Sequence, residues 1–474
     1  MCNCHETKKC CKKRCVKKYV IKSLPYTIDK PGQYCLCKDF TWTLSGTDSG
    51  ISIKNTENVV LDFNQKKITV VKPDPIPDPE IYLPTVLVQN TLDVVLENVH
   101  LEASGAAEHD APGLHILDSG VVEVNSLLTI NMGEFIGKAA LLASNSSEIV
   151  VSKARLDNFG SELFHYGVVF DNVLGFSFTD AETLGNVLYF TNSKNGEILR
   201  CRVDNLNAQN LNRGIIIEGD NQQLGQYSAN IRIAECEILV KDWYGIWNAT
   251  FGFDPAAPEY NRDILIENNI ITGADGDTEF GPSSVQLQNV KDCVVRNNTI
   301  SGELTDGWGI LTIDVINCTL EGNNVMCNKG AEVGIIILQF SQPSYGNLIR
   351  GNHVSAELDY TDPETPASQS FEGIVLGSFF TEDLPASYNT VDRNVVNGFA
   401  VGYTDAFLGL KSKCSIFSNN IANGNGTNYD FTAVDTTDVN NISGCVLPPP
   451  PAPVSLSKLS ETLKVKIGER RERK

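Results

Sequence analysis

One stretch of sequence recurs along the chain with small changes. It reads DILIENNIITG at residues 263–273, DCVVRNNTISG at 292–302 and NCTLEGNNV at 317–325. Each copy alternates apolar residues with other residues and then turns through an Asn-rich corner. Alternation with a period of two is typical of a β-strand with one buried face. The repeat therefore predicts short strands joined by turns that contain Asn.

Further copies extend this pattern over most of the chain. Weaker copies begin at Asn347, Asn389 and Cys414, and a second type of strand begins with glycine. The glycine-led strands start at Gly167, Gly214, Gly245, Gly309, Gly334 and Gly373. One unit is too short to bury its apolar face alone, but stacked copies form a continuous core. We expect the positions in or next to the buried stack to include Ile215, Ile217, Ile264, Ile266, Ile310, Ile336 and Ile374.

Asparagine explains the corners of the repeat. Asn tolerates the left-handed backbone conformation and forms hydrogen bonds with nearby backbone groups. When identical Asn side chains stack in neighbouring coils, they can also form hydrogen-bonded ladders. We therefore expect Asn ladders between successive units.

The repeat resembles the right-handed parallel β-helix of the pectin-lyase-like superfamily over residues 45–445. The segment YTIDKPGQYCLCKDF at residues 26–40 is similar to the capping strand that commonly opens such repeats. The resemblance implies an all-β fold, a single-stranded solenoid of about 13 coils. A leucine-rich-repeat horseshoe or a β-propeller is the alternative, but the signatures that those folds require are absent from the sequence.

Composition divides the chain into five segments. We expect a basic Cys-rich arm at 1–22, an N-terminal cap at 23–44, the repeats at 45–445, a Pro-rich tether at 446–454 and a basic tail at 455–474. The net charge is −20, and because the arm carries +7 and the tail +4, the rest carries −31. A body this acidic repels nucleic acid and anionic lipid. No apolar run is long enough for a membrane span, and no signal peptide is recognised.

Catalytic signatures of the superfamily are missing from the sequence. The Asp-Asp, His-Gly and Arg-x-Lys signatures of polygalacturonases do not occur. Lyases of this fold hold Ca²⁺ on carboxylates, and the nearest pattern is Asp275, Asp277 and Glu279, which alternate as Ca²⁺ ligands can. These carboxylates form either a weak Ca²⁺ site or a solvated Gly-rich turn. We therefore expect no catalytic set and no cofactor other than this candidate Ca²⁺.

Two further features suggest binding. Trp243 and Trp247 form either a platform on which sugar rings stack or an insertion packed on the flank of the repeats. The arm contains Cys2, Cys4, Cys10, Cys11 and Cys15 among basic residues, which favours reactive thiolates. Cross-links between subunits are the preferred interpretation of the arm, with local disulfides, loose metal binding or a disordered tail as alternatives. The later Cys201, Cys236, Cys293 and Cys318 are expected in the core.

These features favour a non-enzymatic structural or binding protein. A basic Cys-rich start on an Asn-rich β-helix resembles proteins encoded by large DNA viruses, which implies a virion component, with a cytoplasmic location as the alternative. The expected partners are further copies of this chain, bound through the arm in a homo-oligomer, and a carbohydrate. The other hypothesis is a carbohydrate-active lyase or hydrolase that acts on an acidic polysaccharide.

Overall fold

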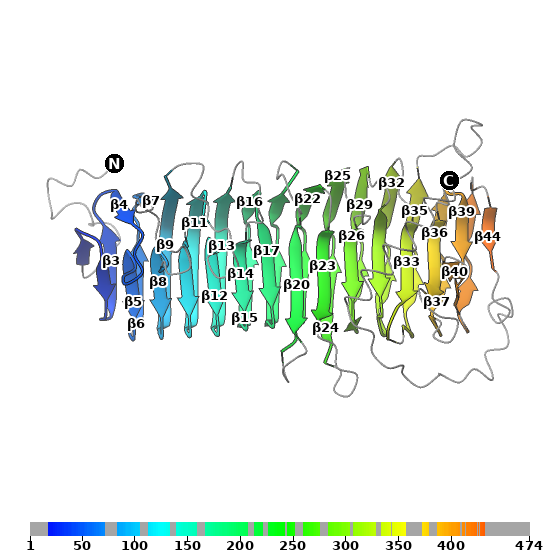
Figure 1. Cartoon of the computed structure of the whole chain (residues 1–474), viewed down its shortest axis with the longest axis horizontal. Helices are drawn as coiled ribbons and strands as arrows, with labels where there is room; N and C mark the ends of the chain where they lie inside the picture. Colours follow the sequence, from blue (N-terminus) through cyan, green and yellow to red (C-terminus); the bar gives the residue numbers. More distant parts are fainter. Residues whose placement is uncertain are drawn as a thin grey trace. The chain divides into compact units, whose positions relative to one another are not determined.

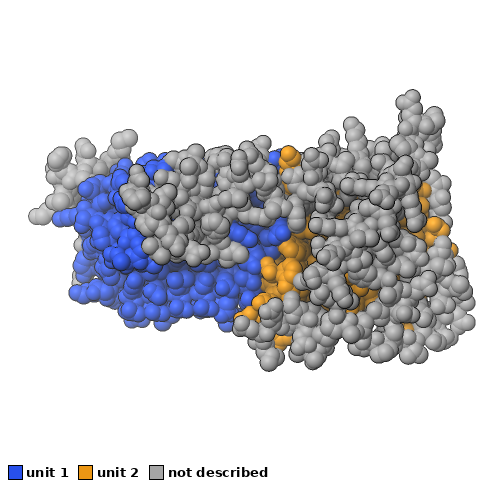
Figure 2. Space-filling view, in the orientation of Figure 1, with its two compact units in different colours: residues 1–216, 228–239 blue, residues 217–227, 240–474 orange. Residues whose placement is uncertain are grey.

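The computed structural model is built from β-strands. It describes residues 18–71, 83–104, 112–132, 139–158, 166–206, 213–220, 226–241, 244–251, 259–274, 283–303, 307–328, 333–342, 344–356, 372–378, 386–407, 410–412, 414–423, 425 and 427–431. No α-helix occurs in these ranges. The chain comprises two compact units, residues 1–216 with 228–239 (unit 1) and 217–227 with 240–474 (unit 2) (Figure 2).

Three series of strands alternate along the chain in unit 1 (Figure 1). The first series is β2 (Tyr26–Ile28), β5 (Ile51–Lys54), β8 (Val86–Gln89), β10 (Leu114–Leu117), β12 (Leu141–Ser144), β14 (Tyr166–Asp171) and β17 (Val187–Thr191). The second is β3 (Gly32–Leu36), β6 (Glu57–Asp62), β15 (Leu174–Thr179), β18 (Lys194–Leu199) and β21 (Ala229–Ala234). The third is β4 (Phe40–Thr43), β7 (Ile68–Val71), β16 (Glu182–Leu184) and β19 (Arg202–Asp204). Three long strands run through both the second and the third series, namely β9 (Leu92–Ala103), β11 (Gly120–Ile130) and β13 (Ser147–Asp157).

Unit 2 repeats the same three series. The first is β23 (Tyr244–Phe251), β26 (Ser283–Gln288), β30 (Trp308–Ile313), β33 (Val333–Gln339), β36 (Glu372–Ser378), β39 (Val401–Thr404) and β44 (Thr427–Asp430). The second is β24 (Asn261–Glu267), β27 (Val290–Lys291), β28 (Val294–Arg296), β31 (Thr319–Glu321), β34 (Leu348–Arg350), β37 (Thr390–Asp392) and β42 (Ile416–Ser418). The third is β25 (Ile270–Ala274), β29 (Thr299–Glu303), β32 (Asn324–Asn328), β35 (His353–Ala356), β38 (Val395–Asn397) and β43 (Ile421–Asn423). A short antiparallel pair, β40 (Ala406–Phe407) with β41 (Leu410–Lys411), follows β39. The divisions between the units fall within β20 (Ile215–Asp220) and β22 (Glu237–Lys241).

Each strand pairs in parallel with the equivalent strand of the next coil, so the chain is an all-β parallel β-helix. In unit 1, Leu114 lies opposite Val86 and Leu141, and in unit 2 Ile335 lies opposite Ile310 and Ile374. All of these side chains are fully buried. The register therefore aligns the apolar positions of successive coils into one core, as parallel pairing requires. The seven predicted isoleucines are all buried.

The first series of unit 2 is buried on both faces, whereas the alternation in the sequence predicted one. Every residue of β26, β30 and β33 is buried. Leu311, Ile336 and Val375 lie opposite one another and belong to a second apolar cluster, on the opposite face from Ile335. A run of apolar residues such as Ile335–Leu338 is typical of a parallel strand that is covered on both faces.

The predicted Asn ladder is confirmed in unit 2. It comprises Asn269, Asn298, Asn323, Asn352, Asn394 and Asn420, one from each coil. From Asn269 to Asn394, each Nδ2 donates to the Oδ1 of the next coil over 2.9–3.1 Å. In the middle of the ladder the same Nδ2 also donates to a backbone carbonyl of the preceding coil, as Asn323 does to Val295 O over 2.9 Å. The ladder thus satisfies buried polar groups at the corner between the second and third series.

The N-terminal boundaries differ from those expected. The predicted arm, residues 1–22, overlaps β1 (Lys18–Ile21), which pairs with β3 and buries Ile21 completely. The predicted cap, residues 23–44, forms a coil of its own because β2, β3 and β4 pair with β5, β6 and β7. The described first-series strands, β20 included, number 15, two more than the roughly thirteen coils expected.

Candidate functional site

The candidate site lies in unit 2 at the corner between the second and third series. At this corner three consecutive residues have different roles in each coil. The first ends a second-series strand, the second has a left-handed backbone, and the third belongs to the buried Asn ladder. The triplets are Glu267–Asn269, Arg296–Asn298, Glu321–Asn323, Arg350–Asn352 and Asp392–Asn394. The ladder therefore fixes the register of the two residues that precede it.

The first residues of these triplets form a charged column. It comprises Glu267, Arg296, Glu321, Arg350 and Asp392, each directly opposite the next in the parallel pairing. The sign of the charge alternates from coil to coil. Like charges directly opposite one another destabilise a sheet, whereas opposite charges stabilise it. The alternation thus supports the register of the strands, and it also places arginines at a regular spacing.

The second residues of the triplets create a hollow beside this column. The backbone φ is about +54 to +64° at Asn297, Gly322, Gly351 and Arg393. Asn and Gly adopt this left-handed conformation readily. Because Gly322 and Gly351 carry no side chain, the surface between Asn297 and Arg393 is open, and a Cβ added at Gly351 would meet no atom within 4 Å.

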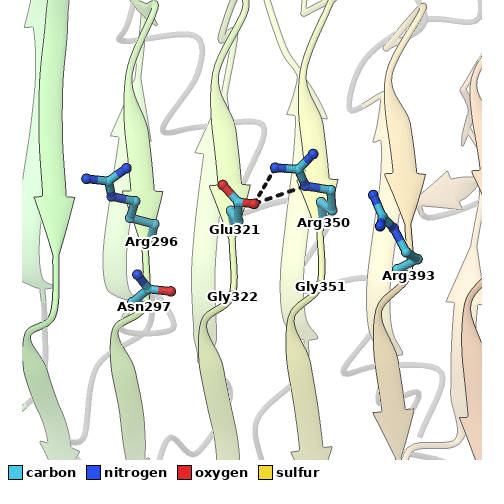
Figure 3. A pocket seen from close by; sticks show the side chains of 7 residues that line it. All are labelled: Arg296, Asn297, Glu321, Gly322, Arg350, Gly351 and Arg393. Atoms are coloured by element: carbon cyan, nitrogen blue, oxygen red, sulfur yellow. Dashed lines mark hydrogen bonds and ion pairs between the residues drawn. The ribbon is translucent and has the colours of Figure 1, made fainter.

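This hollow is a groove of about 640 Å³, here called the arginine groove (Figure 3). It is lined by Arg296, Asn297, Glu321, Gly322, Arg350, Gly351 and Arg393. Figure 3 shows that Arg296, Glu321, Arg350 and Arg393 come from four successive coils and that Glu321 points toward Arg350. The lining thus contains three arginines and one glutamate, on a chain whose net charge is −20.

Ion pairs hold the arginines in place. Arg296 contacts Glu267 over 2.6 Å, and Arg393 contacts Asp392 over 2.7 Å. Arg350 binds Glu321 through two nitrogens, with its Nε at 3.0 Å. The arginine side chains nevertheless remain 43%, 39% and 63% exposed at positions 296, 350 and 393. Each guanidinium carries five N–H donors, so donors are left for a ligand.

The carboxylate of Asp392 is held in its ionised form. It accepts hydrogen bonds from Asn419 Nδ2 at 3.0 Å, Arg393 Nε at 2.7 Å and Ser418 Oγ at 2.8 Å. These donors lower the pKa of Asp392 to about 2. Hydrogen bonds to the charged form of a carboxylate have this effect. Asp392 therefore orients Arg393 and does not carry a proton at neutral pH.

Most candidate residues from the sequence lie outside the described residues. This holds for Asp275, Asp277 and Glu279, for Trp243, and for Cys2, Cys4, Cys10, Cys11 and Cys15. Trp247 is described, on β23, with its ring centroid 5.1 Å from that of Tyr244 and 5.3 Å from that of Phe251. It does not line the arginine groove. Within the described ranges no three His, Cys, Asp or Glu side chains gather as metal ligands would.

The arginines of the groove were not among the residues predicted from the sequence. A signal for two of them was present, because Arg296 and Arg350 occupy the same position of the repeat, immediately before the corner.

The described part of the chain also contains no helix that is long and apolar enough to cross a membrane.

Comparisons with known proteins concern the fold alone. No family model and no curated protein matches the sequence. Among solved structures, a mutant tailspike protein of E. coli bacteriophage HK620 in complex with a pentasaccharide is 12% identical with a TM-score of 0.47, over 85% of this chain and 72% of that one. A mutant of the periplasmic alginate epimerase AlgG is 13% identical with a TM-score of 0.44, over 83% and 85%. The Dettilon tailspike protein is 14% identical with a TM-score of 0.40, and the match covers 85% of this chain but only 61% of that protein.

Proposed function

We propose that this chain is a non-enzymatic binding protein that holds an acidic polysaccharide in the arginine groove. The observation that carries the proposal is the set of exposed arginines that line the groove, Arg296, Arg350 and Arg393. Guanidinium groups bind carboxylates through short, charge-assisted hydrogen bonds that are often bidentate. An anionic ligand fits this lining better than a neutral one.

The spacing of the arginines favours a polymer over a small anion. Neighbouring parallel strands lie about 4.8 Å apart, so Arg296 and Arg350 stand roughly 10 Å apart along the stack, and Arg393 follows one coil further. A chain of uronic acids carries a carboxylate on every sugar and can contact successive arginines. Several weak contacts on one chain then act together.

The state of the carboxylates favours binding over cleavage at this site. Glycoside hydrolysis needs one carboxylic acid with a raised pKa to protonate the leaving group. Asp392 has the opposite property, because its hydrogen bonds lower its pKa to about 2. Glu267 and Glu321 are each bound to an arginine. We therefore expect no unsaturated or shortened product when polygalacturonate is incubated with the protein.

The experiment measures binding of a galacturonate oligomer by isothermal titration calorimetry at low salt. Arg350→Gln should weaken binding about tenfold, the usual effect of losing a charged hydrogen bond. Arg202→Gln is the matched control, since Arg202 in unit 1 is 45% exposed and is also paired with two carboxylates. Equal losses of affinity in the two variants would show that the effect comes from the overall charge of the protein and would contradict the proposal.

A second variant tests the shape of the groove without changing its charge. Gly351→Asn keeps a residue that tolerates the left-handed backbone, and its Cβ meets no neighbour. The new side chain should fill the groove and weaken binding while the protein stays folded. Binding at full strength would show that the ligand does not enter the groove.

The remaining sequence predictions extend this proposal. Cross-linking of subunits by the arm and location in a virion stay predictions. Mass spectrometry of purified particles tests the location directly.

A further inference from the structure

Two cysteines of unit 1 lie opposite one another in neighbouring coils. Leu199 pairs with Ala234 and Arg202 with Glu237, which places Cys201 opposite Cys236. The thiols are 1% and 2% exposed, as expected for core residues. This is the corner that the Asn ladder occupies in unit 2, so the two cysteines take the place of a ladder step.

The two thiols interact with each other and with the backbone around them. Cys201 Sγ lies 3.4 Å from Leu199 O, and Cys236 Sγ lies 3.3 Å from Ala234 O. The interaction between the two thiols lowers the pKa of Cys236 and, together with burial, raises that of Cys201. The thiolate is the reactive form of cysteine, so Cys236 is the nucleophile of the pair.

The backbone places the Cα atoms of the two cysteines at a separation close to that found in disulfides. Parallel neighbours lie about 4.8 Å apart, and disulfides form when the Cα atoms are about 4.4–6.8 Å apart. Side chains that stack in register point in the same direction and do not converge, so the bond needs a small local shift. A disulfide formed with such strain is easily reduced again.

We propose that Cys201 and Cys236 form a peroxide-sensitive pair that closes to a disulfide between neighbouring coils. The Cys236 thiolate attacks hydrogen peroxide, the O–O bond breaks, and a sulfenic acid and one water form after proton uptake. The sulfur of Cys201 then attacks that of Cys236, the S–O bond breaks and a second water leaves. Two thiols and one peroxide thus give one disulfide and two waters.

Two other sites in the core provide internal comparisons. Cys293 and Cys318 also lie opposite one another, because Val294 pairs with Thr319. Burial raises the pKa of Cys293 well above its ordinary value, so this pair should react more slowly. Cys327 lies opposite Gly302 and Ala356, so neither coil beside it offers a second thiol at that position.

The test treats the folded full chain with hydrogen peroxide, unfolds it, alkylates the remaining thiols and maps the peptides by mass spectrometry. We expect a cross-linked species in which the peptides of Cys201 and Cys236 are joined and which is lighter by two hydrogens than the two separate peptides. This species should disappear on treatment with dithiothreitol. Cys327 should remain alkylated. The variant Cys201→Ser should leave Cys236 as a sulfenic acid that a dimedone probe captures. Complete alkylation of both cysteines after peroxide treatment, or equal cross-linking of Cys327, would overturn the proposal.

Discussion

Removal of one side chain from the middle of the Asn ladder should destabilise unit 2 strongly. In the variant Asn323→Ala, four side-chain hydrogen bonds are lost. Asn323 Oδ1 accepts from the backbone N–H and the Nδ2 of Asn298 at 3.1 and 3.0 Å, and its Nδ2 donates to Val295 O and Asn352 Oδ1 at 2.9 Å each.

The cost follows from the groups that lose their partners. The Oδ1 of Asn352 keeps the backbone N–H of residue 323, at 2.9 Å. The backbone N–H of Asn298 and one of its Nδ2 hydrogens lose their partners in a corner that is 1% exposed at Asn298, and the carbonyl of Val295 loses one of its donors. An unsatisfied buried group costs about 1–3 kcal/mol, so the expected loss is about 4 kcal/mol.

The assay combines urea unfolding with amide hydrogen exchange. The midpoint of unfolding should fall, and the backbone amide of Asn298 should lose most of its protection. The matched control is Asn297→Gly, an exposed neighbour with φ of +54°, at which glycine keeps the backbone conformation. A loss for Asn323→Ala that stays within about 1 kcal/mol of this control would refute the argument from the ladder.

Three other outcomes follow from unit 1 and the arm. Burial lowers the pKa of His115 to about 4, so below pH 7 the unfolded chain binds a proton that the folded chain does not, and the free energy of unfolding should fall by about 2 kcal/mol from pH 7 to pH 5. The variant His115→Leu should abolish this part of the pH dependence in urea titrations. An unchanged dependence of stability on pH would contradict the prediction. Val121 is a β-branched residue in the left-handed backbone conformation, with φ of +51°. The variant Val121→Asn should therefore raise the free energy of unfolding by about 1 kcal/mol, seen as a higher midpoint in urea. A lower midpoint would exclude strain at this residue. The full chain should form reducible oligomers on non-reducing gels, and a chain starting at Lys18, which keeps β1, should remain monomeric; identical monomer bands would exclude cross-linking by the arm.

The core and the ladder could be predicted because they repeat at fixed positions of the unit. The buried isoleucines and the corner asparagines both follow from local alternation and from stacking. The strand at Lys18–Ile21 was not expected because its residues continue a basic segment, and its pairing with β3 and the burial of Ile21 place it in the fold.

The arginine groove needed the structure because it depends on register across loops of different length. Arg296 and Arg350 are 54 residues apart in sequence, and their alignment through Glu321 is visible only when strands are paired. The hollow also depends on what is missing, namely the side chains at Gly322 and Gly351. Glycines in an Asn-rich corner are equally consistent with a plain turn, so the sequence alone does not indicate a groove.

The position of a bound galacturonate oligomer tests the central claim most directly. Crystals of the full chain soaked with the oligomer should show it along Arg296, Arg350 and Arg393, with sugar carboxylates within hydrogen-bond distance of at least two guanidinium groups. An oligomer ordered elsewhere on the protein, with an empty groove, would contradict the account.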